Sequence, residues 1–124
     1  MSASSGAIVL STPDPQELAA FYRDLLGWSV ITSESGWVRL RQVDHERPSL
    51  SFQYEPADTP PSWPMREGGV QMQAHLDVLV DDLDSEQQRA AALGASLETH
   101  QPNPDVRVMR DPHGHVFCLF LAGA

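Results

Sequence analysis

The sequence lacks several features that would assign it to a specialised environment. It has a single cysteine, Cys118, so a disulfide framework within the chain is excluded. No apolar run approaches the roughly 20 residues that a membrane-spanning helix needs. Residues 1–6 have neither the positive charge nor the apolar core of a secretory signal. We therefore expect a cytoplasmic protein without a membrane partner.

Positive charge is also scarce. Eight basic residues stand against 17 acidic ones, which gives a formal net charge of −9. Such a field repels a phosphate backbone, so we expect no nucleic-acid partner. The 124 residues are 41% hydrophobic and 20% charged, a balance that is typical of one globular domain.

The first half of the chain predicts a strand, a helix and three more strands. The apolar run 7–12 stops at Pro13, and Asp14 is then a good N-cap, with Glu17 three residues later. Apolar residues at helical spacing predict a helix over 15–26, which Gly27 ends in a left-handed conformation. Alternating polar and apolar residues predict the three strands at 28–32, 36–42 and 49–54.

The second half repeats this order after a linker. Residues 56–69 contain four prolines and two adjacent glycines, which exclude a long regular element. The sequence then predicts a helix over 82–93 and a type I turn at 111–114. Four strands are predicted around them, at 71–80, 95–99, 106–110 and 115–121.

The two halves therefore form an internal repeat. Leu26-Gly27 recurs as Leu93-Gly94, about 67 residues later. We predict a single α+β domain of two βαβββ modules, the first at about 6–55 and the second at about 70–122. Two such sheets can wrap into an incomplete barrel whose concave side holds a ligand.

Three segments of the chain resemble a known family. They are TPDPQELAAFYRDLLGW at residue 12, HLDVLVDDLDSEQQRAAALGA at residue 75 and RDPHGHVFCLF at residue 110. Together they resemble the glyoxalase/bleomycin resistance protein/dioxygenase superfamily, also called vicinal oxygen chelate proteins, and its glyoxalase-like domains. The resemblance implies paired βαβββ modules that form a cupped, incomplete barrel of mixed sheet. It also implies a homodimer and a small-molecule ligand in the cup.

In metal-using members of that superfamily, strand residues of both modules supply about four ligands to a divalent ion. His75 and Cys118 stand at two of those positions, whereas Ala7 or Ile8 and a residue near Ser51 stand at the others. Imidazole and thiolate suit zinc, but two protein ligands are fewer than the three of a usual catalytic site. We therefore predict no cofactor, with a divalent metal as the disfavoured alternative.

His75 and Asp77 are two residues apart on a predicted strand, so both side chains point to the same face. An acid beside an imidazole could orient it as a general base. The alternative is that this face is solvated and Asp77 is a surface charge. The sequence leaves both readings open.

Aromatic residues are the predicted ligand contacts, because they can stack against a flat or apolar molecule. The candidates are Trp37, Phe52, Tyr54 and Trp63, with Cys118 as a small apolar neighbour. Trp63 lies in the proline-rich linker and has no strand to pack into, so it either closes over the ligand or covers a dimer interface. The remaining histidines show no metal-binding spacing.

Two functional hypotheses follow. The first is a metal-independent protein that binds a small molecule, as bleomycin-resistance proteins do. The second is an enzyme, either a lyase, isomerase or dioxygenase-like protein, that uses His75 and Asp77 as acid-base groups or has an atypical metal site. A structural role would leave these two residues unexplained. Sheet edges and apolar surface in so small a chain also favour a homodimer.

Overall fold

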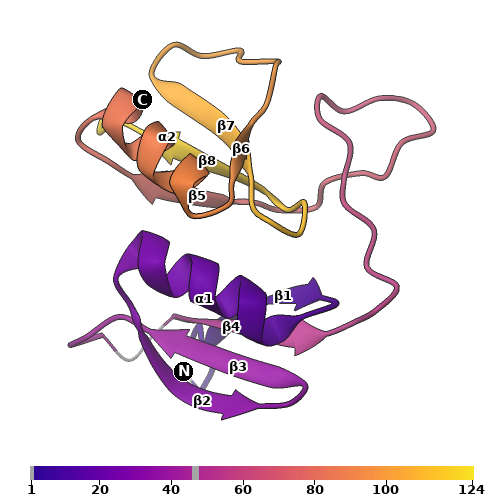
Figure 1. The fold of residues 1–124 in the computed structure, drawn as a ribbon, viewed down its shortest axis with the longest axis vertical. Coiled ribbons are helices and arrows are strands. Elements are labelled where there is room, and N and C mark those ends of the chain that lie inside the picture. The colour runs from indigo at the N-terminus through magenta and orange to yellow at the C-terminus, as the bar shows by residue number, and fades with distance from the viewer. Residues whose placement is uncertain (1, 46–47) are drawn as a thin grey trace. The chain divides into compact units, whose positions relative to one another are not determined.

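The computed structural model describes residues 2–45 and 48–124. The chain divides into two compact units, Met1–Asp58 and Thr59–Ala124. Each unit contains one module with the element order βαβββ (Figure 1). The predicted α+β class with two such modules is confirmed.

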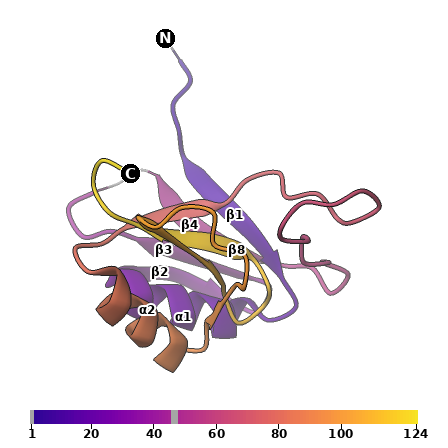
Figure 2. The ribbon, with the colours of Figure 1, turned by 90° about the horizontal axis from the view of Figure 1, so that it is seen from above.

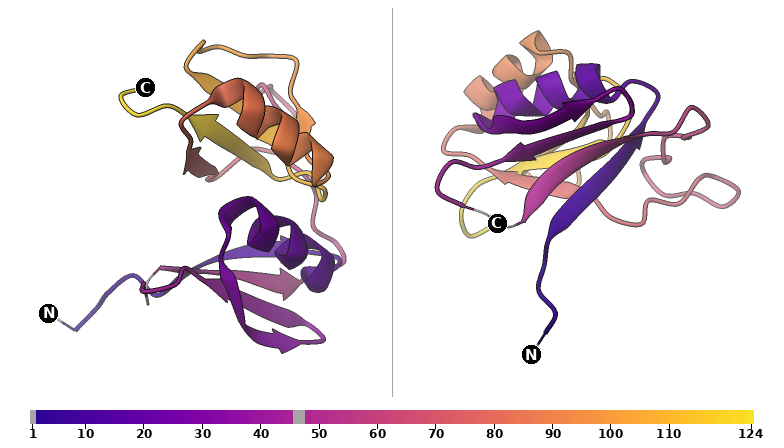
Figure 3. Two further views of the ribbon diagram at one scale, coloured as in Figure 1. Left: turned by 60° about the vertical axis from the view of Figure 1, so that its left-hand side comes forward. Right: turned by 90° about the horizontal axis from the view of Figure 1, so that it is seen from below.

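The first unit is a four-stranded mixed sheet with one helix across it. Its elements are β1 (Ala7–Thr12), α1 (Pro15–Leu26), β2 (Ser29–Glu34), β3 (Trp37–Arg41) and β4 (Ser49–Tyr54). The strand order is β1-β4-β3-β2; β1 and β4 are parallel and the other pairs antiparallel. Figure 3 shows α1 lying along one face of this sheet. Its apolar side packs there on β3 and β4 and forms the core of the unit.

The second unit repeats this topology. Its elements are β5 (Leu76–Leu79), α2 (Leu83–Ala92), β6 (Ser96–Leu97), β7 (Val106–Arg110) and β8 (Val116–Phe120). The order is β5-β8-β7-β6, again with a parallel first pair. The segment 59–75 precedes β5 as a long irregular loop (Figure 2).

The ends of α1 are those predicted from its capping residues. The Asp14 carboxylate accepts a hydrogen bond from the Glu17 backbone N–H at 3.1 Å. Gly27 has φ 70°, and its N–H donates to the Arg23 carbonyl at 2.9 Å. Both contacts satisfy backbone groups that a helix end leaves without partners. The predicted helix is therefore confirmed.

One predicted strand is much shorter in the structure. Instead of 71–80, only Leu76–Leu79 pairs with a neighbour. Its parallel partner β8 begins at Val116, so residues before His75 have no strand to pair with. Val70 instead accepts hydrogen bonds from Ser62, which tie this stretch to the linker. The strands predicted at 7–12, 49–54 and 106–110 have the observed bounds, and the other predicted boundaries differ from the observed ones by two residues at most.

No helix among the described residues is long and apolar enough to cross a membrane. The cytoplasmic location stays a prediction.

Candidate ligand-binding site

His75, Asp77 and Cys118 come together on one face of the second sheet. Asp77 on β5 is directly paired with Cys118 on β8, and His75 lies two residues before Asp77. The His75 Nε2 and the Asp77 Oδ1 are 2.9 Å apart. A ligand atom from each of the three residues lies within 4.8 Å of the other two. We call these three residues the polar cluster.

The members of the polar cluster differ in exposure. The His75 and Asp77 side chains are 35% and 55% exposed, so a dissolved molecule can reach both. Cys118 is buried, and the pKa of its thiol is raised to about 11. Burial is the largest cause, and the negative charge of Asp77 and a hydrogen bond to it also contribute. The thiol therefore keeps its proton at neutral pH and is not a nucleophile there.

A small apolar core, partly covered by half-buried residues, adjoins the polar cluster. Val108 and Val116 are buried together with Cys118, and three half-buried residues pack against them: Trp63, Met72 and Val106. We call these six residues the apolar patch. The linker thus returns to the sheet through Trp63, whose indole Nε1 donates to the His100 carbonyl at 3.0 Å. Sequence reasoning singled out Trp63 and Cys118 but missed Met72, Val106, Val108 and Val116.

The other predicted aromatic contacts lie in the first unit. The Trp37 ring is half-buried beneath the Arg39 guanidinium, which is 5.5 Å from the ring centroid. Tyr54 is 53% exposed. Phe52 is fully buried and stacks on Tyr22 of α1, with ring centroids 5.7 Å apart. Phe52 is therefore a core residue, and a ligand cannot reach its ring in this structure.

The first module offers no metal ligands at the positions that match the polar cluster. Counting back five residues from each helix N-cap reaches Val9 in the first module and Asp77 in the second. Val9 pairs with Ser51, as Asp77 pairs with Cys118, and Ala7 then matches His75. Ser51 accepts a hydrogen bond from the Arg39 Nε at 3.1 Å, so the positively charged guanidinium lies beside the Ser51 hydroxyl. A four-ligand metal site drawn from both modules does not fit these residues.

The polar cluster alone has donor types that suit zinc, and Asp77 brings their number to three. In the structure, however, the His75 Nε2 is bonded to Asp77 and the Cys118 thiol holds its proton. A metal ion would have to break that bond and displace that proton. The cluster is therefore arranged as a hydrogen-bonded group.

Comparisons with known proteins agree with the repeated module. The sequence model of the glyoxalase-like domain matches residues 7–120. No curated protein sequence matches the chain. Among solved structures, a glyoxalase/bleomycin resistance protein/dioxygenase family enzyme from Burkholderia phytofirmans PsJN is 19% identical with a TM-score of 0.72, over 96% of this chain and 98% of that chain.

Two further structures share the fold. A fosfomycin resistance protein from Listeria monocytogenes is 16% identical with a TM-score of 0.71, over 98% of this chain and 95% of its own. A bleomycin-binding protein from Streptomyces verticillus, solved with copper(II)-bleomycin, is 17% identical with a TM-score of 0.59, over 98% of each chain. At these identities the likeness shows a common fold and nothing finer.

Proposed function

We propose that this chain, which belongs to the glyoxalase-like domain family, binds a small organic molecule without a metal cofactor. One observation carries the proposal: the polar cluster and the apolar patch share one face of the second sheet. Small-molecule sites combine an apolar lining with a few convergent polar groups in this way. The bleomycin-binding neighbour supports a binding role for the fold.

The chemistry of this face favours a flat, largely apolar ligand. The Trp63 indole is held at its Nε1 by His100 and offers a fixed aromatic surface. Met72 beside it can adapt to an irregular shape. His75 and Asp77 then supply hydrogen bonds at the exposed margin.

Two features support metal independence. At the positions that match the polar cluster, the first module has Ala7, Val9 and Ser51. The Ser51 hydroxyl accepts a hydrogen bond from the positively charged Arg39 side chain. In the second module, a metal would have to displace the Cys118 thiol proton, whose pKa is raised to about 11, and compete with the His75–Asp77 contact. Metal ligation requires those atoms to be deprotonated and free.

Binding can be tested with N-phenyl-1-naphthylamine, a neutral planar probe whose fluorescence rises in apolar surroundings. We expect saturable binding that Trp63→Ala weakens by about 1 kcal/mol or more, as for a buried aromatic anchor. Trp63→Phe is the matched control, because it keeps an aromatic ring and removes only the bond to His100. Equal affinity in wild type and Trp63→Ala would remove Trp63 from the site.

A second candidate function is acid-base catalysis by His75 and Asp77. The 2.9 Å separation of their side chains favours it, because a carboxylate at that distance orients the imidazole for proton transfer. Mass spectrometry of a bound compound distinguishes the two functions. A compound recovered unchanged supports binding alone. A product that forms in wild type but in neither His75→Asn nor Asp77→Asn supports an enzyme.

A further inference from the structure

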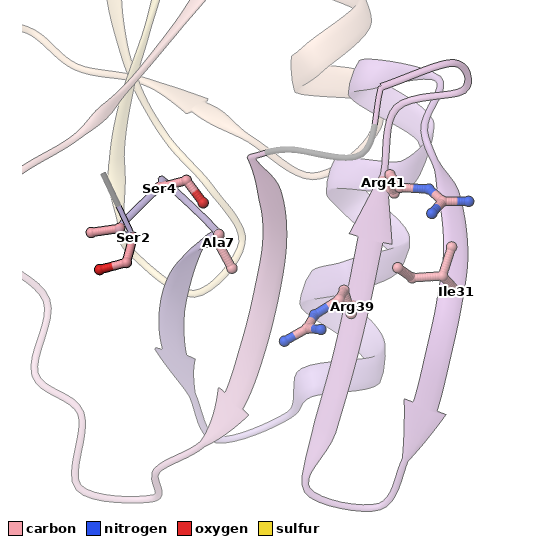
Figure 4. Close-up of a pocket in the computed structure, with 8 residues that line it drawn as sticks. Ser2, Ser4, Ala7, Ile31, Arg39 and Arg41 are labelled. Carbon is pink, nitrogen blue, oxygen red and sulfur yellow. The ribbon is translucent and has the colours of Figure 1, made fainter.

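The first unit contains a pocket that the proposed function does not use. Its volume is about 600 Å³, and its lining includes Arg39 and Arg41 of β3, Ile31 of β2 and the segment around Ser2 and Ser4 (Figure 4). Among the described residues, 2–45 and 48–124, none of those that line it is acidic, although the chain has a net charge of −9. We propose that this pocket binds a small molecule through a negatively charged carboxylate or phosphate group.

Arg39 is held in place by neutral groups. Its Nε donates to the Ser51 hydroxyl at 3.1 Å, and its guanidinium lies over the Trp37 ring. Neither contact cancels the positive charge. The bond through Nε leaves the two terminal nitrogens of the guanidinium to donate to an anion, and their planar arrangement matches a carboxylate or phosphate.

Arg41 adds a second charge to the same pocket. It lies two residues further along β3 and lines the pocket with Arg39. Within residues 2–45 and 48–124, neither arginine forms an ion pair with a carboxylate. Four other arginines do form such pairs, namely Arg23, Arg89, Arg107 and Arg110. An anion in this pocket is attracted by both positive charges, which Figure 4 shows reaching to either side of β3.

The fold does not require a cation at the position of Arg39. In the first sheet Arg39 pairs with Ser51, and in the second sheet Val108 pairs with Cys118, the counterpart of Ser51. The same topology is therefore built with a buried valine where the first module has an arginine. The two modules have diverged at matching positions, one toward positive charge and the other toward the polar cluster.

This inference does not rest on the proposed function, because every residue that lines the pocket belongs to the first unit. The site and the polar cluster are therefore tested with different probes and different variants. Failure of one leaves the other standing.

The test is a ¹H–¹⁵N NMR titration of the full chain with inorganic phosphate and, separately, with acetate, both at constant ionic strength. We expect saturable shifts at Arg39, Arg41 and the segment 2–7. Arg39→Gln and Arg41→Gln should each weaken binding about tenfold, because each removes a charge-assisted hydrogen bond. Arg39→Lys keeps the charge without the planar fork and should lie between these and wild type. The tighter of the two anions identifies the chemical group.

The matched control is Arg89→Gln, which removes one positive charge from α2, where Arg89 pairs with Glu86. Its affinity for both anions should equal that of wild type. The proposal is overturned if neither anion gives saturable shifts, or if Arg89→Gln weakens binding as much as the pocket variants. Arg41 is exposed, so Arg41→Gln retains the fold and keeps the test decisive if Arg39→Gln unfolds.

Discussion

The chemistry of Cys118 depends on where its side chain lies. It is paired with Asp77 across two strands and is buried against Val108 and Val116. Burial and, to a smaller extent, the Asp77 carboxylate raise the pKa of the thiol to about 11, from an ordinary value of 9.0. A cysteine in this setting is an apolar packing residue with a proton to donate to Asp77, rather than a reactive thiolate.

This raised pKa predicts a loss of stability at alkaline pH. Between pH 9.0 and about 11 the folded chain keeps the thiol proton and the unfolded chain releases it. The stabilisation is complete below pH 9.0 and disappears as the pH rises through the pKa of the folded state. The free energy of unfolding should fall by about 2 kcal/mol more in wild type than in Cys118→Ala.

Urea unfolding of both proteins from pH 8 to about 11 measures this difference. The chain has no lysine, so few other groups titrate in this range. Its two tyrosines are common to both proteins and drop out of the comparison. Parallel stability curves for wild type and Cys118→Ala would show that the thiol titrates alike in the folded and unfolded states.

At the scale of the elements, the conformation of the turn between β7 and β8 depends on one glycine, Gly114. Gly114 has φ 93°, and its N–H donates to the Asp111 carbonyl at 3.0 Å, as the predicted turn requires. A Cβ at this position would lie 2.6 Å from the Pro60 Cγ, which is shorter than a carbon contact allows. The linker therefore packs directly on the backbone of the turn.

We expect Gly114→Ala to destabilise the chain by roughly 2–4 kcal/mol, since it adds overpacking to the cost of a left-handed alanine. Gly27→Ala is the control, because Gly27 also has positive φ but has open space around its Cβ position. It should cost only about 1–2 kcal/mol. Thermal unfolding of the two variants measures the difference, and equal costs would mean that Pro60 moves aside freely.

Local sequence signals predicted the elements where one residue determines the backbone. Asp14, Pro15 and Gly27 bounded α1 at the observed residues. The strand predicted from residue 71 failed, because periodicity describes a side-chain pattern and cannot tell whether a partner strand reaches that far. Phe52 was misplaced for a related reason, since alternation separates the two faces of β4 without identifying the face that α1 covers.

The candidate sites were predictable in unequal parts. The two-residue spacing of His75 and Asp77 placed them on one face, but only the pairing of β5 with β8 joins Cys118 to both. The sequence did contain a signal for Val106 and Val108. They are two residues apart on β7 and therefore share a face, as Val116 and Cys118 do on β8. Arg39 and Arg41 carried none, since an arginine at every second position of a strand is typical of a solvated face.

At the scale of the molecule, each sheet has an edge strand, β1 or β5, with apolar side chains exposed to solvent. Ile8 and Val9 of β1 are 44% and 45% exposed, and Leu79 of β5 is 61% exposed. Edge strands of this kind favour pairing with another chain. We therefore predict a homodimer, in which a symmetric partner covers this surface. Light scattering at micromolar concentration should give about twice the chain mass of 13.7 kDa, and a clean monomer would contradict the prediction.

The resemblance of three sequence segments to glyoxalase-like domains predicted the repeated βαβββ order, and the family match over residues 7–120 confirms the family. It could not predict the ligand chemistry. That chemistry depends on side chains at matching positions of the two modules. The first module has Ser51 and Arg39 there, and the second has Cys118 and Val108. Such replacements leave the backbone pattern unchanged, so the family signal does not record them.

The central claim is that this chain binds a small organic molecule without a metal ion, and native mass spectrometry of the purified protein tests it most directly. We predict a chain mass that carries a retained organic molecule or none, without a stoichiometric metal, and no change of mass after a chelator is added. His75→Ala serves as the reference, because it removes one of the three donors of the polar cluster. One metal ion per chain in wild type, absent from His75→Ala, would contradict the claim and make the polar cluster a metal site.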